Sequence, residues 1–176
     1  MSQVRFIADL HLGHVNMAVK RGFASVEEHD AHIIAQWNSV VAKRDVTYIL
    51  GDVTMEKKAP YALLDQLNGR KHVVMGNHDR RQDVAALLQF VDSVAGMVQY
   101  KGLILTHCPI HPMELDYRFP RNIHGHIHEK QVMIDAPMAP FEIPDDRYIC
   151  VSCEQINYTP KTLQQLNINY EKYIKK

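Results

Sequence analysis

His72-Val73-Val74-Met75-Gly76-Asn77-His78-Asp79 is the stretch that decides the fold of this 176-residue chain. Its first four residues have the composition of a buried strand, and the strand ends at Gly76 in a short polar loop. Glycine fits positions where the backbone turns sharply or approaches another group closely. The stretch therefore predicts a strand whose carboxyl end presents an amide, an imidazole and a carboxylate.

The same pattern recurs on both sides of this stretch. Apolar runs before and after it end in short loops that hold Asp or His, several of them next to Gly: Asp9-Leu10-His11, Gly51-Asp52, Thr106-His107 and Gly125-His126-Ile127-His128. In parallel α/β sheets, functional groups gather at the carboxyl ends of the strands. We therefore expect the five loops to converge, although they are far apart in the sequence.

The segments between these loops alternate between helical and extended patterns. Ser25-Val26-Glu27-Glu28 has capping-box spacing and predicts an amphipathic helix over residues 26–43. Further expectations are helices over 59–67 and 82–90, a hairpin at 97–106, a strand over 147–151, a proline-rich loop over 135–146 and a closing helix from Thr159-Pro160. The alternation predicts one α/β domain over residues 1–176, with parallel pairing in the first half and a hairpin-based sheet in the second.

Composition argues against several classes of function. Lys+Arg and Asp+Glu both number 20, so no global charge favours tight binding to duplex DNA or to an anionic membrane. No apolar stretch approaches the roughly 18 residues of a membrane span, and the N-terminus lacks the layout of a signal peptide. Three cysteines are too few for a disulfide framework. We expect a cytoplasmic protein and leave its oligomeric state open.

The side chains in the five loops suit metal binding. Carboxylates, imidazoles and one carboxamide, with no thiolate in the loops, favour hard or borderline cations such as Mn, Fe or Zn. Asp9 and His11 point the same way if the backbone is extended, as do His126 and His128. A carboxylate such as Asp52 can bridge two metals, and an amide such as Asn77 adds an oxygen ligand without adding charge.

In this order the five loops resemble the motifs of the calcineurin-like metallophosphoesterase superfamily: Asp-x-His, Gly-Asp, Gly-Asn-His-Asp/Glu, His and Gly-His-x-His. The resemblance covers residues 9–128. It implies two packed mixed β-sheets flanked by helices, a four-layer α-β-β-α sandwich in a single domain. Gly13-His14-Val15-Asn16 is similar to the opening loop of compact bacterial and phage-encoded members. Val53-Thr54-Met55 replaces the Asp-Arg-Gly of the protein Ser/Thr phosphatases, which disfavours that subclass.

The resemblance also implies a role for each motif residue. Two divalent ions are expected, with Mn favoured and Fe, Zn, Ni or Mg as alternatives. One ion would be held by Asp9, His11, Asp52 and His128, and the second by Asp52, Asn77, His107 and His126. His78 would be catalytic, stabilising the phosphoryl group and protonating the leaving oxygen, with Asp79 in a supporting position. The substrate-binding candidates are His14, Arg80 and Arg121.

The expected function is hydrolysis of a small nucleotide-type or similar phosphodiester by a hydroxide held between the two ions. A phosphomonoesterase is the alternative. A non-catalytic scaffold is disfavoured because every motif position is intact. The physiological substrate, the native metal pair and the roles of His124 and of the Cys150/Cys153 pair stay open, although burial in the structure is the favoured role for both cysteines.

Overall fold

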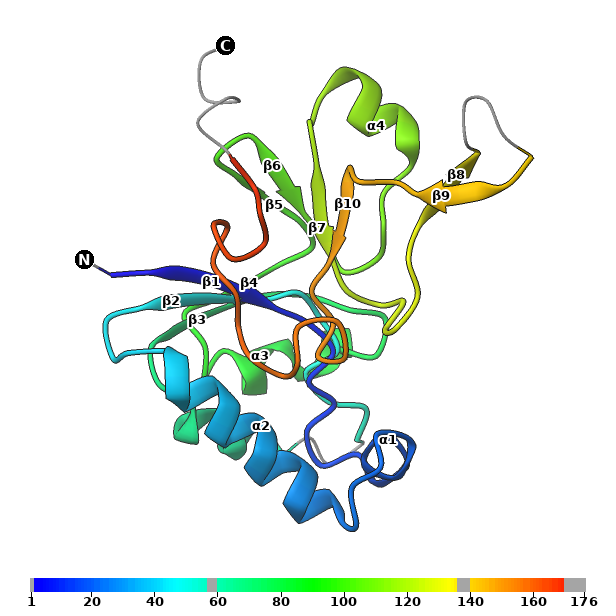
Figure 1. The fold of residues 1–176 in the computed structure, drawn as a ribbon. Coiled ribbons are helices and arrows are strands. Elements are labelled where there is room, and N and C mark those ends of the chain that lie inside the picture. The colour runs from blue at the N-terminus through cyan, green and yellow to red at the C-terminus, as the bar shows by residue number, and fades with distance from the viewer. Residues whose placement is uncertain (1, 57–59, 136–139, 170–176) are drawn as a thin grey trace.

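Two four-stranded sheets form the centre of the protein in a computed structural model, which describes residues 2–56, 60–135 and 140–169 (Figure 1). The first sheet is wholly parallel in the order β1-β2-β3-β4, with strands Val4–Ile7, Val46–Ile49, Arg70–Val74 and Ser93–Ala95. The second is mixed in the order β10-β7-β6-β5, with strands Tyr148–Cys150, Asn122–His124, Leu103–Leu105 and Val98–Tyr100. Its β5–β6 pair is the predicted hairpin, whereas β6, β7 and β10 run parallel.

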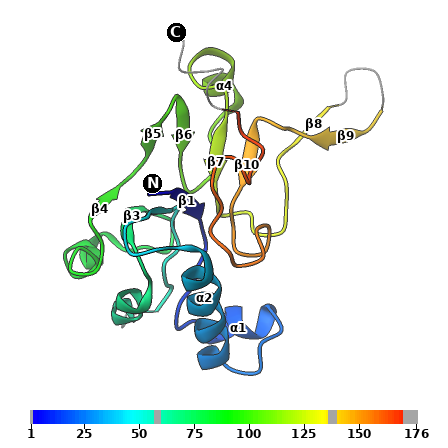
Figure 2. The ribbon, with the colours of Figure 1, turned by 60° about the vertical axis from the view of Figure 1, so that its left-hand side comes forward.

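Helices cover the outer faces of both sheets. On the side of the first sheet lie α1 (Val15–Lys20), α2 (Val26–Val40), α3 (Val84–Leu87) and the 3-10 helices η1 (Tyr61–Gln66) and η2 (Arg81–Asp83), as Figures 1 and 2 show for the α-helices. On the other side, Leu115 of α4 (Pro112–Tyr117) packs with residues of β6 and β10 in a separate small core. The predicted α/β fold with two packed sheets flanked by helices is therefore confirmed.

The main core lies between the sheets and under α2. Phe6 of β1 stacks on Tyr48 of β2 at 5.8 Å between ring centroids and meets Tyr100 of β5 edge-on at 5.6 Å, so an aromatic group joins the two sheets. On α2, Ser25 accepts a hydrogen bond from the backbone of Glu28 at 3.1 Å, as the capping-box spacing predicts. The fully buried Trp37 completes this core, and burial of such a side chain contributes about 1.5–3 kcal/mol.

Three expectations from the sequence were wrong in part. The segment 61–66 is a 3-10 helix rather than an α-helix. The described residues after Thr159 form turns instead of a closing helix, because Lys161 exchanges backbone hydrogen bonds with Phe6 at 2.9 and 3.1 Å and is held extended beside β1. The proline-rich span contains strand residues: β8 (Met133–Asp135) and β9 (Glu142–Pro144) form an antiparallel hairpin that projects from the body in Figures 1 and 2.

The topology brings six strand ends to one edge of the molecule. Strands β1, β2 and β3 of the first sheet and β6, β7 and β10 of the second all lead into loops there. The sheets also join at this edge, since Ala8 donates to Val151 at 2.8 Å and accepts from Cys153 at 3.1 Å. Among the described residues, none of the helices is both long and apolar enough to cross a bilayer. The cytoplasmic location stays a prediction.

Candidate metal centre

The carboxylate of Asp52 lies at the centre of the five loops. Its Oδ2 is 3.8 Å from His11 Nε2, 3.4 Å from His107 Nε2 and 4.0 Å from His78 Nε2. Asp52 is almost fully buried, whereas the His78 side chain is 39% exposed. Imidazoles from three separate loops thus surround one buried carboxylate.

The ligand atoms form two overlapping groups. Those of Asp9, His11 and His128 all lie within 4.8 Å of one another, and so do those of Asp9, Asp52 and His107. Asn77 Oδ1 lies 2.8 Å from His107 Nε2, and the rings of His107 and His126 are 5.0 Å apart. The structure therefore brings all seven residues that the sequence predicts as ligands into one cluster.

The backbone is strained at most of these positions. Five of the seven residues have positive φ: Asp9 (58°), His11 (50°), Asp52 (53°), His126 (73°) and His128 (51°). Non-glycine residues rarely adopt this conformation, and such strain gathers at functional sites, at about 1–3 kcal/mol per residue. The backbone within Asp9-x-His11 and His126-x-His128 is therefore not extended at these four residues, and left-handed turns position their side chains.

Steric crowding between the loops requires glycine at the motif positions. A Cβ at Gly76 would lie only 2.5 Å from the Asp52 nitrogen, and one at Gly125 would lie 2.6 Å from Asp9 Oδ2. A Cβ at Gly51 would collide with the backbone of Gly76 at 2.7 Å, and Gly51 itself has φ of 86°. The loops approach one another so closely that only glycine fits between them and the carboxylates.

The imidazoles present the atoms that a cation needs. His107 Nδ1 donates to the carbonyl of Leu50 at 2.8 Å, and His128 Nδ1 donates to Glu154 at 2.9 Å, which fixes the orientation of each ring. Both ring nitrogens of His11 are buried without a hydrogen-bond partner in the described residues. Burial lowers the pKa of His11 to about 3, so its ring is neutral. These residues fit a divalent cation, which would satisfy the orphaned His11 nitrogen.

Three carboxylates lie close together at the centre. Burial raises the pKa of Asp9, which accepts hydrogen bonds from Ser152 Oγ at 2.6 Å and from the His126 backbone at 3.0 Å. Burial also acts to raise the pKa of Asp52, but the hydrogen bond and charge of His107 outweigh it and the pKa falls. Asp79, whose pKa is raised by burial, accepts from the backbone of Asp52 and Gly76 at 2.8 Å each and so ties the two loops together.

The sequence did not predict the side chains that hydrogen-bond to the candidate ligands and their loops. Arg21 is buried and donates to the carbonyls of Asp9 at 2.7 Å and Leu10 at 3.1 Å, and to Glu154 at 2.8 Å. The buried His29 lies 2.9 Å from the Arg21 guanidinium. No motif marks Arg21, Glu154 or Ser152; the only signal is the presence of charged residues in segments that must be buried.

The three residues predicted to bind substrate differ in their position relative to the candidate ligands. His14 lies at the rim, with its ring 6.2 Å from that of His11 and its Nδ1 2.8 Å from Glu56. The Arg80 guanidinium is paired with Asp83 at 2.6 Å. Arg121 precedes β7, at the end opposite the Gly-His-x-His loop, and faces Asp146 at 3.5 Å. The structure therefore brings His14 to the rim of the centre and does not bring Arg121 there.

His124 and the cysteine pair lie behind the centre. His124 is fully buried, its Nδ1 is 2.8 Å from the Gly125 carbonyl, and burial lowers its pKa to about 4. Cys150 and Cys153 are free thiols. Burial raises the pKa of Cys153 to about 12, so this thiol stays protonated. These features indicate packing rather than chemistry for the pair.

Comparisons with known proteins extend this picture, although no family model matches the chain. An uncharacterized protein of Methanocaldococcus jannaschii is 33% identical over 168 residues, covering 93% of this chain and 88% of that protein. The gene 66 protein of Mycobacterium phage D29 is 42% identical over 86 residues, which are 46% of this chain and 42% of the phage protein.

Solved structures show the same fold. A protein of unknown function from Aquifex aeolicus superposes with a TM-score of 0.70 at 21% identity, covering 95% of this chain and 98% of that one. The nuclease MPE of Pseudomonas putida superposes with a TM-score of 0.51 at 21% identity, covering 80% and 66%. The chain therefore belongs to one family with the M. jannaschii protein and shares its fold with these solved structures, while its five strand-end motifs resemble those of the calcineurin-like metallophosphoesterases.

Proposed function

We propose that this protein is a dinuclear-metal phosphoesterase that hydrolyses small phosphodiesters, nucleotide-derived ones included. The position of Asp52 carries the proposal. One oxygen of this buried carboxylate lies 3.8 Å from His11 Nε2, in the first group, and 3.4 Å from His107 Nε2, in the second. A carboxylate this close to imidazoles of both groups is suited to bridging two cations.

The ligands of the two ions would be the residues of the two groups. Asp9, His11 and His128 would hold one ion and Asn77, His107 and His126 the other, with Asp52 shared. When bound, two divalent ions, Mn²⁺ in our first choice, would supply an activated water and neutralise charge on the phosphate oxygens. Asp9, Asp52 and His107 are buried and hydrogen-bonded, which holds these three ligands in place before the ester arrives.

His78 and His14 would contact the ester. The backbone N–H of His78 is held by Asp52 Oδ1 at 3.0 Å, while its imidazole is 39% exposed and so can reach a bound phosphate. We assign it the proton donated to the leaving oxygen. His14 stands at the rim with Glu56, where it would face one substituent of the ester.

The charges around the centre favour a diester over a monoester. A monoester phosphate carries close to two negative charges at neutral pH and a diester carries one. The arginines near the centre are engaged elsewhere: Arg21 is buried against Glu154, and Arg80 is paired with Asp83. Such a site suits the lower charge of a diester. The same fold in a nuclease, an enzyme that cleaves phosphodiesters, also supports this choice.

A hydrolysis panel tests the proposal. Metal-stripped protein is given Mn²⁺, Mg²⁺, Ni²⁺ or Zn²⁺ and assayed with p-nitrophenyl phosphate, bis-p-nitrophenyl phosphate and 2′,3′-cyclic nucleotides. We expect metal-dependent hydrolysis with the highest kcat/KM for a diester. A higher kcat/KM for the monoester under the best metal would reverse the substrate choice. Absence of hydrolysis with every metal and ester, while Asp52→Asn and wild type behave alike, would reject the enzyme itself.

A further inference from the structure

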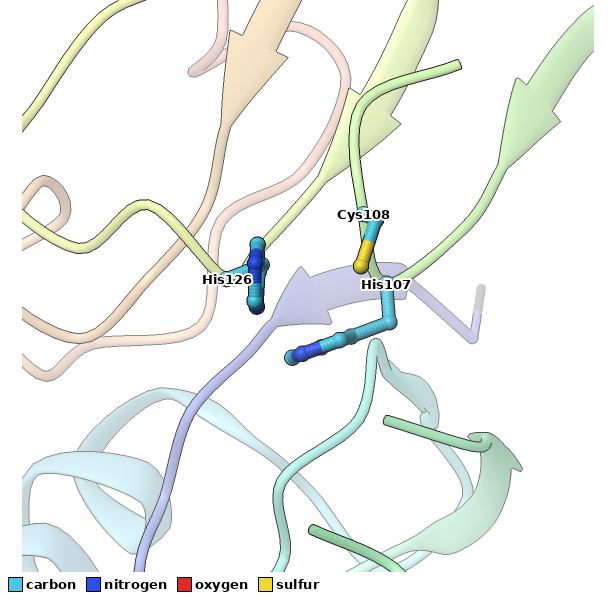
Figure 3. A group of neighbouring side chains, drawn as sticks. All are labelled: His107, Cys108 and His126. Atoms are coloured by element: carbon cyan, nitrogen blue, oxygen red, sulfur yellow. The ribbon is translucent and has the colours of Figure 1, made fainter. Parts of the chain in front are cut away.

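Cys108 lies beside the imidazoles at one of the two metal positions. It directly follows His107 in the loop after β6, and Figure 3 shows its sulfur facing the space between the rings of His107 and His126. The Sγ atom and a nitrogen of each ring all lie within 4.8 Å of one another. The sequence-based view that the loops contain no thiol near the centre was therefore wrong.

The sulfur and the neighbouring ring are not committed to other partners. In the described part of the chain, neither Cys108 Sγ nor the His126 imidazole makes a hydrogen bond, and both residues are exposed. The other two thiols differ, since Cys150 contacts Ser152 Oγ at 3.1 Å and Cys153 is fully buried in the main core. An uncommitted thiol and imidazole side by side can both turn toward one cation.

The two metal positions would then differ in chemistry. Around Asp9, His11 and His128 the described residues supply oxygen and nitrogen atoms only. The position at His107 and His126 adds sulfur, a soft donor. Thiolate ligands select Zn²⁺, Fe²⁺ or Co²⁺ over Mn²⁺ and Mg²⁺, which prefer oxygen.

We propose that Cys108 is a sulfur ligand of the metal position formed by His107 and His126, and that it biases this position toward Zn²⁺, Fe²⁺ or Co²⁺. On binding, the cation takes the place of the thiol proton, which is released to solvent. The inference rests on the metal centre of the proposed function. It makes the centre a mixed pair, with a harder cation beside Asp9 and a softer one beside Cys108.

Cobalt reports on the sulfur directly, without any activity measurement. Metal-free wild-type protein is titrated with Co²⁺ while near-ultraviolet absorption is followed, where a thiolate–cobalt bond gives a charge-transfer band. We expect a band that saturates with one of the two bound Co²⁺ ions. Cys108→Ser should abolish the band, and the matched control Cys150→Ser should keep it. In competition, Cys108→Ser should also weaken Zn²⁺ relative to Mn²⁺ by roughly tenfold or more.

The outcomes separate this inference from the function on which it rests. Two bound Co²⁺ ions without the band would overturn the role of Cys108 and leave the dinuclear centre intact. A band that survives Cys108→Ser but disappears in Cys150→Ser would place the sulfur ligand elsewhere and overturn the proposal as well. Protein that binds no Co²⁺ would defeat both the sulfur ligand and the metal centre.

Discussion

His78 differs from its neighbours Asn77 and Asp79 in the direction of its side chain. Asn77 turns inward to His107, and Asp79 is buried among backbone amides of the adjoining loops. The backbone N–H of His78 donates to Asp52 at 3.0 Å, and its partly exposed ring reaches the surface of the centre. Under the proposed function, three consecutive residues would provide a metal ligand, a substrate contact and a support for the loops.

Replacing His78 with Ala should leave both metals bound, because no coordination bond is removed. Loss of the proton donor should lower kcat by about 10²–10⁴-fold for a poor leaving group. A good leaving group such as p-nitrophenolate departs with little help and should suffer less. Metal content and kcat across leaving groups of graded pKa check this. A drop to one ion per chain would make His78 a ligand, and equal losses for all leaving groups would assign the proton to another group.

Gly76 offers a purely steric test of the site, because its φ is not positive and alanine is compatible with its backbone. The added methyl would press on the Asp52 backbone and carboxylate. Gly76→Ala should therefore displace Asp52 and weaken metal binding, with loss of most hydrolysis. Gly96→Ala is the matched control, since nothing lies within 4 Å of its added Cβ. Equal metal affinity in the two variants, measured by calorimetry, would contradict the crowding argument.

At the scale of elements, Arg21 and Glu154 connect the end of α1 to the loops after β1, β7 and β10. Arg21 is the C-cap of α1, and it bonds the carbonyls of the first loop and the carboxylate of Glu154. The hydrogen bond from His128 and the charge of Arg21 overcome the effect of burial and lower the pKa of Glu154 to about 2. Glu154 is therefore ionised and orients His128.

Glu154→Gln should weaken metal binding at the position of Asp9, His11 and His128 by about 10–100-fold, as is usual when the partner of a histidine ligand is lost. Binding at the other position should change little. The control is Glu129→Gln, which removes an exposed carboxylate from the same neighbourhood that pairs with Lys20 at 3.7 Å. Calorimetric titration with Mn²⁺ resolves the two positions. A uniform loss at both, or an equal loss in the control, would argue for a general effect on folding.

Arg147 ties β10 to α4 and to the turn before the strand. It donates to Asp145 at 2.7 Å and to Asp116 at 2.6 Å. The hydrogen bonds from Arg147 hold the pKa of Asp145 below its usual value of 3.8. A carboxyl group whose pKa is lower in the folded than in the unfolded protein stabilises the fold. This stabilisation is complete above the pKa of the unfolded state and is lost as the pH falls through the pKa of the folded state. Asp145→Asn should thus destabilise the protein by about 1–3 kcal/mol near pH 7.

The same difference should shrink as the pH falls below 4, because the wild-type carboxylate then becomes protonated too. Urea unfolding of both proteins between pH 3 and pH 7 measures it. Since Asp145 is distant from the metal ligands in the sequence and the variant changes no motif, hydrolysis at neutral pH serves as the check on folding. A stability difference that does not vary with pH would show that the ion pair is not its cause.

The elements that the sequence predicted well are those with local signals. Ser25 and Glu28 mark the start of α2, and the apolar runs before Gly51-Asp52 and Gly76-Asn77 mark β2 and β3. Lys161 shows what local patterns cannot predict, because its backbone is extended by pairing with Phe6, 155 positions earlier. Pairing of this kind depends on the assembled sheets rather than on neighbouring residues.

The candidate site, like the fold, could be predicted from the sequence only where local motifs mark it. Its seven metal-ligand candidates could be predicted because each belongs to a short motif at a strand end. Arg21 and Glu154 could not, since they meet only after α1 and the loop after β10 have folded over the first loop. The left-handed backbone at Asp9 and Asp52 also escaped prediction, because it is imposed by contacts between loops rather than by residue preference.

At the scale of the whole molecule, the metal centre is where the two sheets meet. Asp9 and Asp52 follow strands of the first sheet, whereas His107 and His126 follow strands of the second. Ions held between them would add bonds across the joint, beside the backbone pairing at Ala8. They would also offset the repulsion among buried carboxylates, since Asp52 raises the pKa of Asp79 by its charge, after the larger effect of burial.

Metal removal should therefore destabilise the entire domain and not only the loops. A ligand that binds only the folded state, at a free concentration 100 times its Kd, stabilises that state by about 2.7 kcal/mol per site. For a chain of this size each kcal/mol raises Tm by about 2–4 °C, so Mn²⁺ at that excess should raise Tm by several degrees over chelator-treated protein.

Asp52→Asn, which weakens both positions at once, should lose most of this rise. His78→Ala should keep it, because that residue holds no ion. Scanning calorimetry of the three proteins with chelator and with Mn²⁺ makes the comparison. An unchanged Tm in wild type would mean that the ions do not hold the sheets together, and a rise retained in Asp52→Asn would mean that Asp52 is not the shared ligand.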